Sequence, residues 1–258
     1  MRILSIESST RSASVAVADC ISPLSDDPRQ ILSVLLTDAG NSNHPIKFLA
    51  NENTNTIDAI VPVGASAALA PVIDKVLRDS ATKAADLDLI AVSIGPGSFT
   101  GLRVGIVTAK TLAYATGCQL VGIHAGDVLA FQTLVSCDER PIPKKLAIGL
   151  DIGRGEVLSY EYKLKESGFK SNHDGVILKP QDWQHGLYPG SWATGSGLGL
   201  IDDSVKCNLV MPESLQPEAR SVAALGVAQF FQNGPTDFWK LEPIYSRPSA
   251  AEEARARK

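Results

Sequence analysis

Apolar and polar residues alternate along this chain in short blocks, a pattern typical of strands and helices that follow one another. Residues 3–6 form a buried apolar run, and residues 12–18 form a second run in which apolar and small polar residues alternate. Such runs predict two β-strands. The polar stretch between them, residues 7–11, is short enough to join them as a β-hairpin.

A glycine-rich turn between an apolar run and a helical pattern is the most informative stretch. Residues 89–94 predict a buried strand, Gly95-Pro96-Gly97-Ser98 predicts a tight turn, and residues 100–117 predict a helix that Gly117 ends. The free N–H groups of such a helix start favour a phosphate or another anion. The spacing matches neither the Walker loop nor GxGxxG, so a turn that only packs helix on sheet is the favoured interpretation.

Helical periodicity predicts another helix over residues 64–80. Its apolar face consists of Leu69, Val72, Ile73, Val76 and Leu77. Residues 119–123 predict a strand, and residues 125–134 predict the helix that follows it. Residues 31–36 are predicted as a further strand among polar loop segments, one of which holds His44.

The second half of the chain begins with the same strand–turn–strand pattern as the first half. Pro141-Ile142-Pro143 indicates a boundary, after which residues 145–151 and 156–162 predict two strands joined by a turn. Each half therefore opens with a hairpin that has an acidic residue at its turn, which indicates an internal duplication. Residues 221–231 predict a further amphipathic helix.

Composition places the chain among ordinary globular proteins of one or two domains. It has 258 residues, 44% of them hydrophobic, and a net charge of −4, which argues against a broad electrostatic grip on nucleic acid. The four cysteines show no CxxC spacing and indicate a reducing compartment. Neither a signal peptide nor a membrane-spanning run is visible, so a cytoplasmic protein without membrane contact is expected.

Candidate chemistry is sparse in this sequence. The four histidines, His44, His124, His173 and His185, share no short spacing, so no metal site is predicted. The hydroxyl-rich turn that begins at Glu7 suits a phosphate or a magnesium ion as well as it suits ordinary turn chemistry. The residues alone leave both interpretations open.

Four segments together carry a resemblance to a known family. MRILSIESSTRSASVAV, GPGSFTGLRVG, LDIGRGEVLSYEY and LEPIYSRP resemble the TsaB (YeaZ) family, which is needed for the threonylcarbamoyladenosine modification of tRNA. The resemblance implies an α/β fold of two ASKHA domains, the actin-like ATPase and sugar-kinase architecture related to RNase H, with mixed sheets flanked by helices. The expected domains are residues 1–140, which bind the partner and carry an insertion around 21–60, and residues 141–258.

The resemblance implies a scaffold rather than an enzyme. In the family, TsaB pairs with the catalytic subunit TsaD, which modifies N6 of adenosine 37 in tRNAs reading ANN codons, and the ATPase TsaE joins them. The expected partners are thus TsaD, TsaE and, through the complex, tRNA, with a homodimer as an option when the protein is alone. TsaD holds its metal with a His-x-x-x-His pair, but the matching residues 64–71 contain no histidine. No catalytic residue and no metal ligand are therefore expected.

Site residues follow from the same resemblance. No cofactor of its own is expected, apart from a nucleotide, ATP or ADP, held weakly or at the partner interface. Cofactor contacts are predicted at Ser9, Thr10, Gly97 and Ser98. Partner contacts are predicted at Leu69, Ile73, Arg103, Ala109, Leu112 and Ala113.

One departure from the family bears on an alternative function. Glu7 stands where the family usually has Asp, and the added methylene would displace a carboxylate that holds magnesium through water. The alternative is an ASKHA-type phosphotransferase or acyltransferase acting on its own. Glu7, Ser9 and Ser98 would then lie near phosphate, with Asp151 as the second carboxylate.

Overall fold

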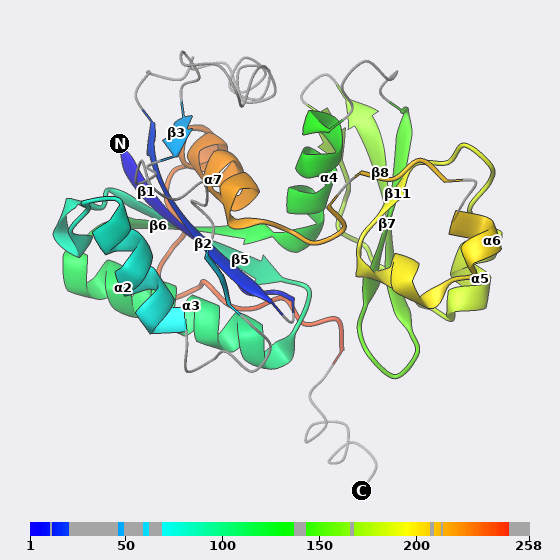
Figure 1. Ribbon diagram of the computed structural model, residues 1–258, viewed down its shortest axis with the longest axis horizontal. Helices are drawn as coiled ribbons and strands as arrows, with labels where there is room; N and C mark the ends of the chain where they lie inside the picture. Colours follow the sequence, from blue (N-terminus) through cyan, green and yellow to red (C-terminus); the bar gives the residue numbers. More distant parts are fainter. Residues whose placement is uncertain are drawn as a thin grey trace, which may run out of the picture.

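The protein contains two β-sheets with helices packed against them (Figure 1). The computed structural model describes residues 1–10, 12–20, 46–48, 59–61, 69–136, 143–165, 168–206, 209–212 and 214–247. The predicted strand at residues 31–36, His44 and most of the predicted insertion at residues 21–60 lie outside the described residues.

The first sheet is mixed and forms around the predicted hairpin. Its strands run in the order β3 (Ile46–Phe48), β2 (Ala13–Cys20), β1 (Arg2–Glu7), β5 (Leu89–Gly95) and β6 (Gln119–His124), and β4 (Ala59–Val61) also pairs with β2. Strand β1 is antiparallel to β2 and parallel to β5, which in turn is parallel to β6. The carboxyl ends of β1 and β5 therefore meet at one edge of the sheet.

Helices cover both faces of this sheet, because successive side chains of a strand point to opposite faces. Helices α2 (Leu69–Asp79) and α3 (Phe99–Thr116) pack on the face that carries Leu4, and α7 (Ala219–Asn233) packs on the face that carries Ile3 (Figure 1). The short 3₁₀ helix η2 (Ala84–Asp86) precedes β5. Among the described residues, no helix combines the length and the apolar character that crossing a bilayer requires.

The second sheet repeats the plan of the first. Its strands run in the order β10 (Val176–Leu178), β8 (Val157–Lys165), β7 (Lys145–Asp151) and β11 (Ala193–Thr194), and β9 (Gly168–Lys170) also pairs with β8. Strand β7 is antiparallel to β8 and parallel to β11, as β1 is to β2 and β5. The matching topology confirms the predicted duplication and the predicted α/β class with two mixed sheets.

Helices also lie on both faces of the second sheet. Helix α4 (Ala125–Val135) packs on one face, while α5 (Pro180–His185), η3 (Ser196–Leu200) and α6 (Asp203–Lys206) pack on the other. Helix α4 is shared by both halves, since Val128 lies in the core of the first half and Leu129 in the core of the second.

Helix α7 returns to the first half after the chain has built the second. Its buried side chains, among them Val222 and Val227, fill the face of the first sheet that α2 and α3 leave open. The predicted C-terminal domain, residues 141–258, thus contributes one helix to the core of the N-terminal half. Sequence order places α7 with the second half, but its apolar surface is buried by the first.

Candidate functional site

The glycine-rich segment brings the start of α3 against the turn of the first hairpin. Ser98 caps α3 through its Oγ, which accepts a hydrogen bond from the N–H of Gly101 at 3.3 Å. The N–H of Ser98 donates to the carbonyl oxygen of Ser9 at 2.6 Å. A Cβ at Gly97 would lie 2.0 Å from that same oxygen, so only glycine permits this approach. The segment is therefore a close contact between helix and hairpin, in agreement with the favoured interpretation.

A cleft of about 1030 Å³ opens beside this contact, between the two halves. The first half contributes Ser9, Thr10, Gly97 and Ser98 to its wall, and the turn of the second hairpin contributes residues 151–154. The structure thus brings the four predicted cofactor contacts together in one place. Asp151 lies in the opposite wall, where its Oδ1 accepts a hydrogen bond from the N–H of Gly153 at 2.8 Å.

Arg103 lies in the wall of this cleft, although it was predicted as a partner contact. Its guanidinium lies 4.0 Å from the centre of the Phe99 ring, and its Nε donates to the hydroxyl of Tyr245 at 2.8 Å. The rings of Phe99 and Tyr245 are 4.7 Å apart. A cluster of two aromatic rings and one cation therefore forms part of the cleft wall.

Arg247 ties the C-terminal segment to the second half. Its guanidinium pairs with a carboxylate oxygen of Glu156 at 3.1 Å and donates to the carbonyls of Ile152 and Gly153 at 3.1 and 3.3 Å. Lys179, together with Arg247, holds the pKa of Glu156 below its usual value. Sequence reasoning assigned no role to Arg247, although it lies in LEPIYSRP, one of the segments that carry the resemblance.

Glu7 lies at the end of β1, directly beneath the hairpin turn, and is fully buried. One carboxylate oxygen accepts the N–H of Ser9 at 2.5 Å, and the other has no hydrogen-bond partner among the described residues. Burial raises the pKa of Glu7 to about 7, despite the opposing effect of the polar groups of Ser9 and Ser93. A carboxyl that is about half protonated at pH 7 is a weaker magnesium ligand than an ordinary, fully ionised one, because hard cations bind ionised oxygens.

The structure buries four of the six predicted partner contacts within the chain, whereas Leu112 and Arg103 keep exposed surface. Leu69, Ile73, Ala109 and Ala113 are all buried under their own sheet, where they pack in one core with strands β1 and β2. Leu112 is partly buried against the same core. Helical periodicity identified a buried face correctly, but that face is covered from within the chain and is not available to a partner in this structure.

A different set of side chains forms an exposed apolar surface beside α3. Val107 and Tyr114 on α3 are 62% and 80% exposed, and Trp239 is 79% exposed. Phe238 links Tyr114 to Trp239, because its ring lies 6.4 Å from that of Tyr114 and 5.1 Å from that of Trp239. Val107 lies seven residues before Tyr114 and hence on the same side of α3. We call these four residues the α3 outer surface. Sequence periodicity missed it because Phe238 and Trp239 lie far along the chain from α3.

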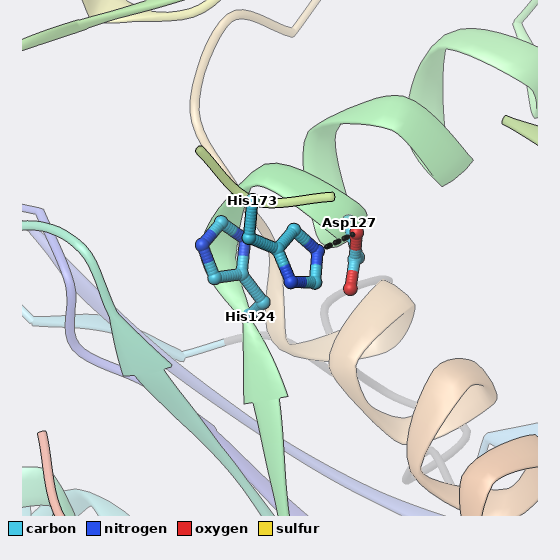
Figure 2. A group of neighbouring side chains, drawn as sticks. All are labelled: His124, Asp127 and His173. Carbon is cyan, nitrogen blue, oxygen red and sulfur yellow. Dashed lines mark hydrogen bonds and ion pairs between the residues drawn. The ribbon is translucent and has the colours of Figure 1, made fainter. Parts of the chain in front are cut away.

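Two histidines that are distant in the sequence meet at the start of α4 (Figure 2). His124 caps α4 by accepting the N–H of Gly126 on Nδ1 at 3.1 Å, and the ring of His173 stacks on it at 4.0 Å. The Nε2 of His173 donates to Asp127 at 2.9 Å, as does the hydroxyl of Tyr162.

These residue types bind metals in many proteins, and the ligand atoms of His124, Asp127 and His173 lie within 4.8 Å of one another. The imidazole planes are only 13° from parallel, however. Because a ring nitrogen donates within the plane of its ring, two stacked imidazoles do not direct their lone pairs at one ion in this arrangement. The geometry is that of a hydrogen-bonded cluster.

Comparisons with known proteins agree with one another. The family model described as TsaD, tRNA N6-adenosine threonylcarbamoyltransferase, matches residues 49–214. The tRNA threonylcarbamoyladenosine biosynthesis protein TsaB of Escherichia coli K12 is 26% identical over 97% of this chain and 96% of its own length. The tRNA N6-adenosine threonylcarbamoyltransferase of Lawsonia intracellularis is 41% identical, but over 36% of this chain and only 25% of its own.

Among solved structures, YeaZ from Pseudomonas aeruginosa superimposes with a TM-score of 0.66 at 18% identity. The match covers 95% of this chain and 99% of that one. At this level of identity the likeness concerns the fold, and it supports the ASKHA-type fold class expected from the sequence.

Proposed function

We propose that this protein is a non-catalytic subunit of the complex that modifies tRNA. The chain belongs to the TsaD family and, within it, to the TsaB (YeaZ) group, which acts in the biosynthesis of threonylcarbamoyladenosine in tRNA. It pairs with TsaD, which modifies N6 of adenosine 37 in tRNAs reading ANN codons. TsaE joins the pair, and tRNA contacts this chain only through the complex.

The observation that carries this proposal is the extent of each match. The match to E. coli TsaB covers 97% of this chain and 96% of that protein, whereas the match to the Lawsonia transferase covers only 36% of this chain and 25% of that protein. The likeness to TsaB therefore extends over nearly the whole chain. The residues that match the histidine-bearing helix of TsaD, 64–71, contain no histidine. Both features favour a subunit that supports catalysis in its partner.

The α3 outer surface is the part of this chain that best suits the partner. Its three most exposed members, Val107, Tyr114 and Trp239, are large apolar side chains in water, and such patches commonly mark protein contacts. Lys110 lies beside them, with its Nζ 5.5 Å from the centre of the Phe238 ring. We propose this surface in place of the four buried residues that were expected as partner contacts from the family resemblance.

The proposal is tested by size-exclusion chromatography with light scattering, which measures molar mass. The samples are this protein alone, TsaD of the same organism alone, and their mixture. Each sample is then assayed for threonylcarbamoylation of tRNA. A one-to-one complex with activity only in the mixture supports the proposal. No complex, together with ATP turnover by this chain alone, overturns it.

Two matched substitutions test the surface. Val107→Glu places a charge on the α3 outer surface, and Val176→Glu places the same charge on β10 of the second half, where the valine is 57% exposed. Val107→Glu should weaken the complex by roughly 100-fold, since an unpaired charge in an interface costs several kcal/mol. Val176→Glu should leave affinity unchanged. Equal effects of the two variants would refute the assignment of the surface.

A second role, weak nucleotide binding, is favoured by the cleft. The hydroxyls of Ser9, Thr10 and Ser98 and the guanidinium of Arg103 line it together, and these groups suit phosphate. Calorimetric titration with ATP and magnesium tests this role. Binding that Arg103→Ala weakens supports it, and no heat at millimolar ATP excludes it.

A further inference from the structure

The start of α4 is a point where ionisable groups from both halves meet. Asp127 lies in the first turn of α4, where the helix dipole favours a negative charge. Tyr162 comes from β8, and His173 comes from the connection between β9 and β10. Figure 2 shows the ring of His173 between that of His124 and the carboxylate of Asp127. The two hydrogen bonds to Asp127 therefore join the second sheet and its β9–β10 connection to α4.

The pair formed by His173 and Asp127 favours a charged state. The hydrogen bond to Asp127 raises the pKa of His173 above its usual 6.5, against the effect of partial burial. Burial opposes ionisation of Asp127, yet the hydrogen bond from His173 and the nearby imidazoles hold the pKa of its carboxyl below the usual value. Both groups are thus charged when the pH is below the pKa of His173.

The other ionisable groups around His173 have their pKa values shifted in directions that fix their protonation states. Burial, followed by the charge of His173, lowers the pKa of His124 to about 4, so that ring stays neutral under its stacked neighbour. Burial and the charge of Asp127 raise the pKa values of Tyr160 and Tyr162, which therefore stay protonated. Lys170 on β9 lowers the pKa of His173 slightly.

The remaining charged and polar groups near His173 do not replace Asp127 as the partner of its Nε2. Asp174 accepts a hydrogen bond from the side chain of Asn172 at 2.5 Å. From α7, the side chains that face the same region are neutral amides, Gln229, Gln232 and Asn233. A hollow of about 200 Å³ separates α7 from β9, and both Asp127 and His173 line it.

We propose that His173 is a proton-operated clamp that holds the β9–β10 connection of the second half against α4, the helix that the two halves share. With a proton on each ring nitrogen, His173 donates to Asp127 as one member of an ion pair. When it loses a proton, only a hydrogen bond between a neutral ring and a carboxylate remains.

The direction of the effect follows from the sign of the shift. Since the pKa of His173 is higher in the folded protein than in the unfolded chain, the clamp contributes fully below pH 6.5 and is lost as the pH rises through the folded value. The connection should therefore open more often at alkaline pH, and the hollow beside α7 should open with it.

The test uses the full-length protein. An NMR titration of the histidine rings should give a value above 6.5 for His173. Hydrogen–deuterium exchange across residues 168–178, corrected for the intrinsic effect of pH, should be about threefold faster at about pH 8 than at about pH 6, the size expected of a partly exposed ion pair.

A matched pair of variants isolates the clamp. His173 has a φ of 60°, a conformation that asparagine tolerates, so His173→Asn removes the titrating ring without adding backbone strain. This variant should show fast exchange at both pH values. His185→Asn changes an exposed histidine at the end of α5 and should behave like the natural protein.

Three results would overturn the proposal. The first is a pKa of His173 at or below 6.5, and the second is a pH dependence of exchange that survives in His173→Asn. The third is slow exchange that a chelator such as EDTA abolishes, because that result would identify a metal centre instead of a proton clamp.

Discussion

Replacing Glu7 by Gln should stabilise this protein, and more so at higher pH. Glu7 is fully buried, and one of its carboxylate oxygens has no partner among the described residues. Gln has nearly the same shape as a protonated Glu, and its carbonyl oxygen can still accept the N–H of Ser9. The substitution thus removes a charge that Ser9 and Ser93 compensate only in part, and it keeps the hydrogen bond from the N–H of Ser9.

The magnitude follows from the shift in the pKa of Glu7. Burial moves it from 4.5 to about 7, and each unit corresponds to about 1.4 kcal/mol, so ionising Glu7 costs the folded state about 3 kcal/mol. Below pH 4.5 both states hold the proton and the free energy of unfolding is unaffected. Between the two values the unfolded chain releases the proton first, so stability falls as the pH rises.

Urea denaturation followed by circular dichroism measures this effect. At about pH 8 the free energy of unfolding of Glu7→Gln should exceed that of the natural protein by about 3 kcal/mol, and at about pH 4.5 the two should agree. Glu242→Gln, at an exposed glutamate, serves as the control and should change stability by less than about 0.5 kcal/mol. If Glu7→Gln destabilises the protein at pH 8, the carboxylate is compensated, for example by a bound cation, and the reasoning fails.

Two further predictions concern the contacts around the cleft. Gly97→Ala would bring a Cβ within 2.0 Å of the carbonyl oxygen of Ser9 and should lower the free energy of unfolding by about 1–3 kcal/mol in urea titrations. Gly199→Ala, where a Cβ meets nothing within 4 Å, should be nearly neutral, and equal losses would contradict the steric explanation. Arg247→Ala removes a partly buried ion pair and two hydrogen bonds to carbonyls, so cleavage by chymotrypsin after Tyr245 should be about tenfold faster. An unchanged rate would show that Arg247 does not hold the C-terminal segment.

The secondary structure around the glycine-rich segment, residues 95–98, followed from local patterns. The predicted strand at residues 89–94 is β5 (Leu89–Gly95), and the predicted helix at 100–117 is α3 (Phe99–Thr116), which Gly117 caps with a φ of 75°. Glycine after a helical run and serine before it act within one turn of the chain. Such capping signals depend only on residues a few positions away, so helix ends of this kind can be predicted from the sequence alone.

The candidate cleft was predicted only in part. Ser9, Thr10, Gly97 and Ser98 were expected to act together, and they do line one cleft. The pattern favoured a turn that packs helix on sheet over a phosphate site, and at Gly97 the structure shows such packing, because α3 approaches the hairpin turn too closely for a side chain. Tyr245 and Arg247 complete the wall from the far end of the chain, and no local pattern relates them to α3.

The sequence by itself determined the class of fold, the two hairpins, the duplication and the family, because each depends on short-range patterns or on motifs that are read residue by residue. Only the tertiary structure decided which surfaces stay exposed and which distant groups meet. Ala109 was expected to contact a partner, but in the structure it is buried beneath its own sheet. His124 and His173 show no related spacing in the sequence, yet the β9–β10 connection brings their rings into contact at the start of α4. Burial and the coupling of charges depend on contacts between segments that are distant in the sequence. Periodicity within one helix or strand carries no information on which distant segments it will contact.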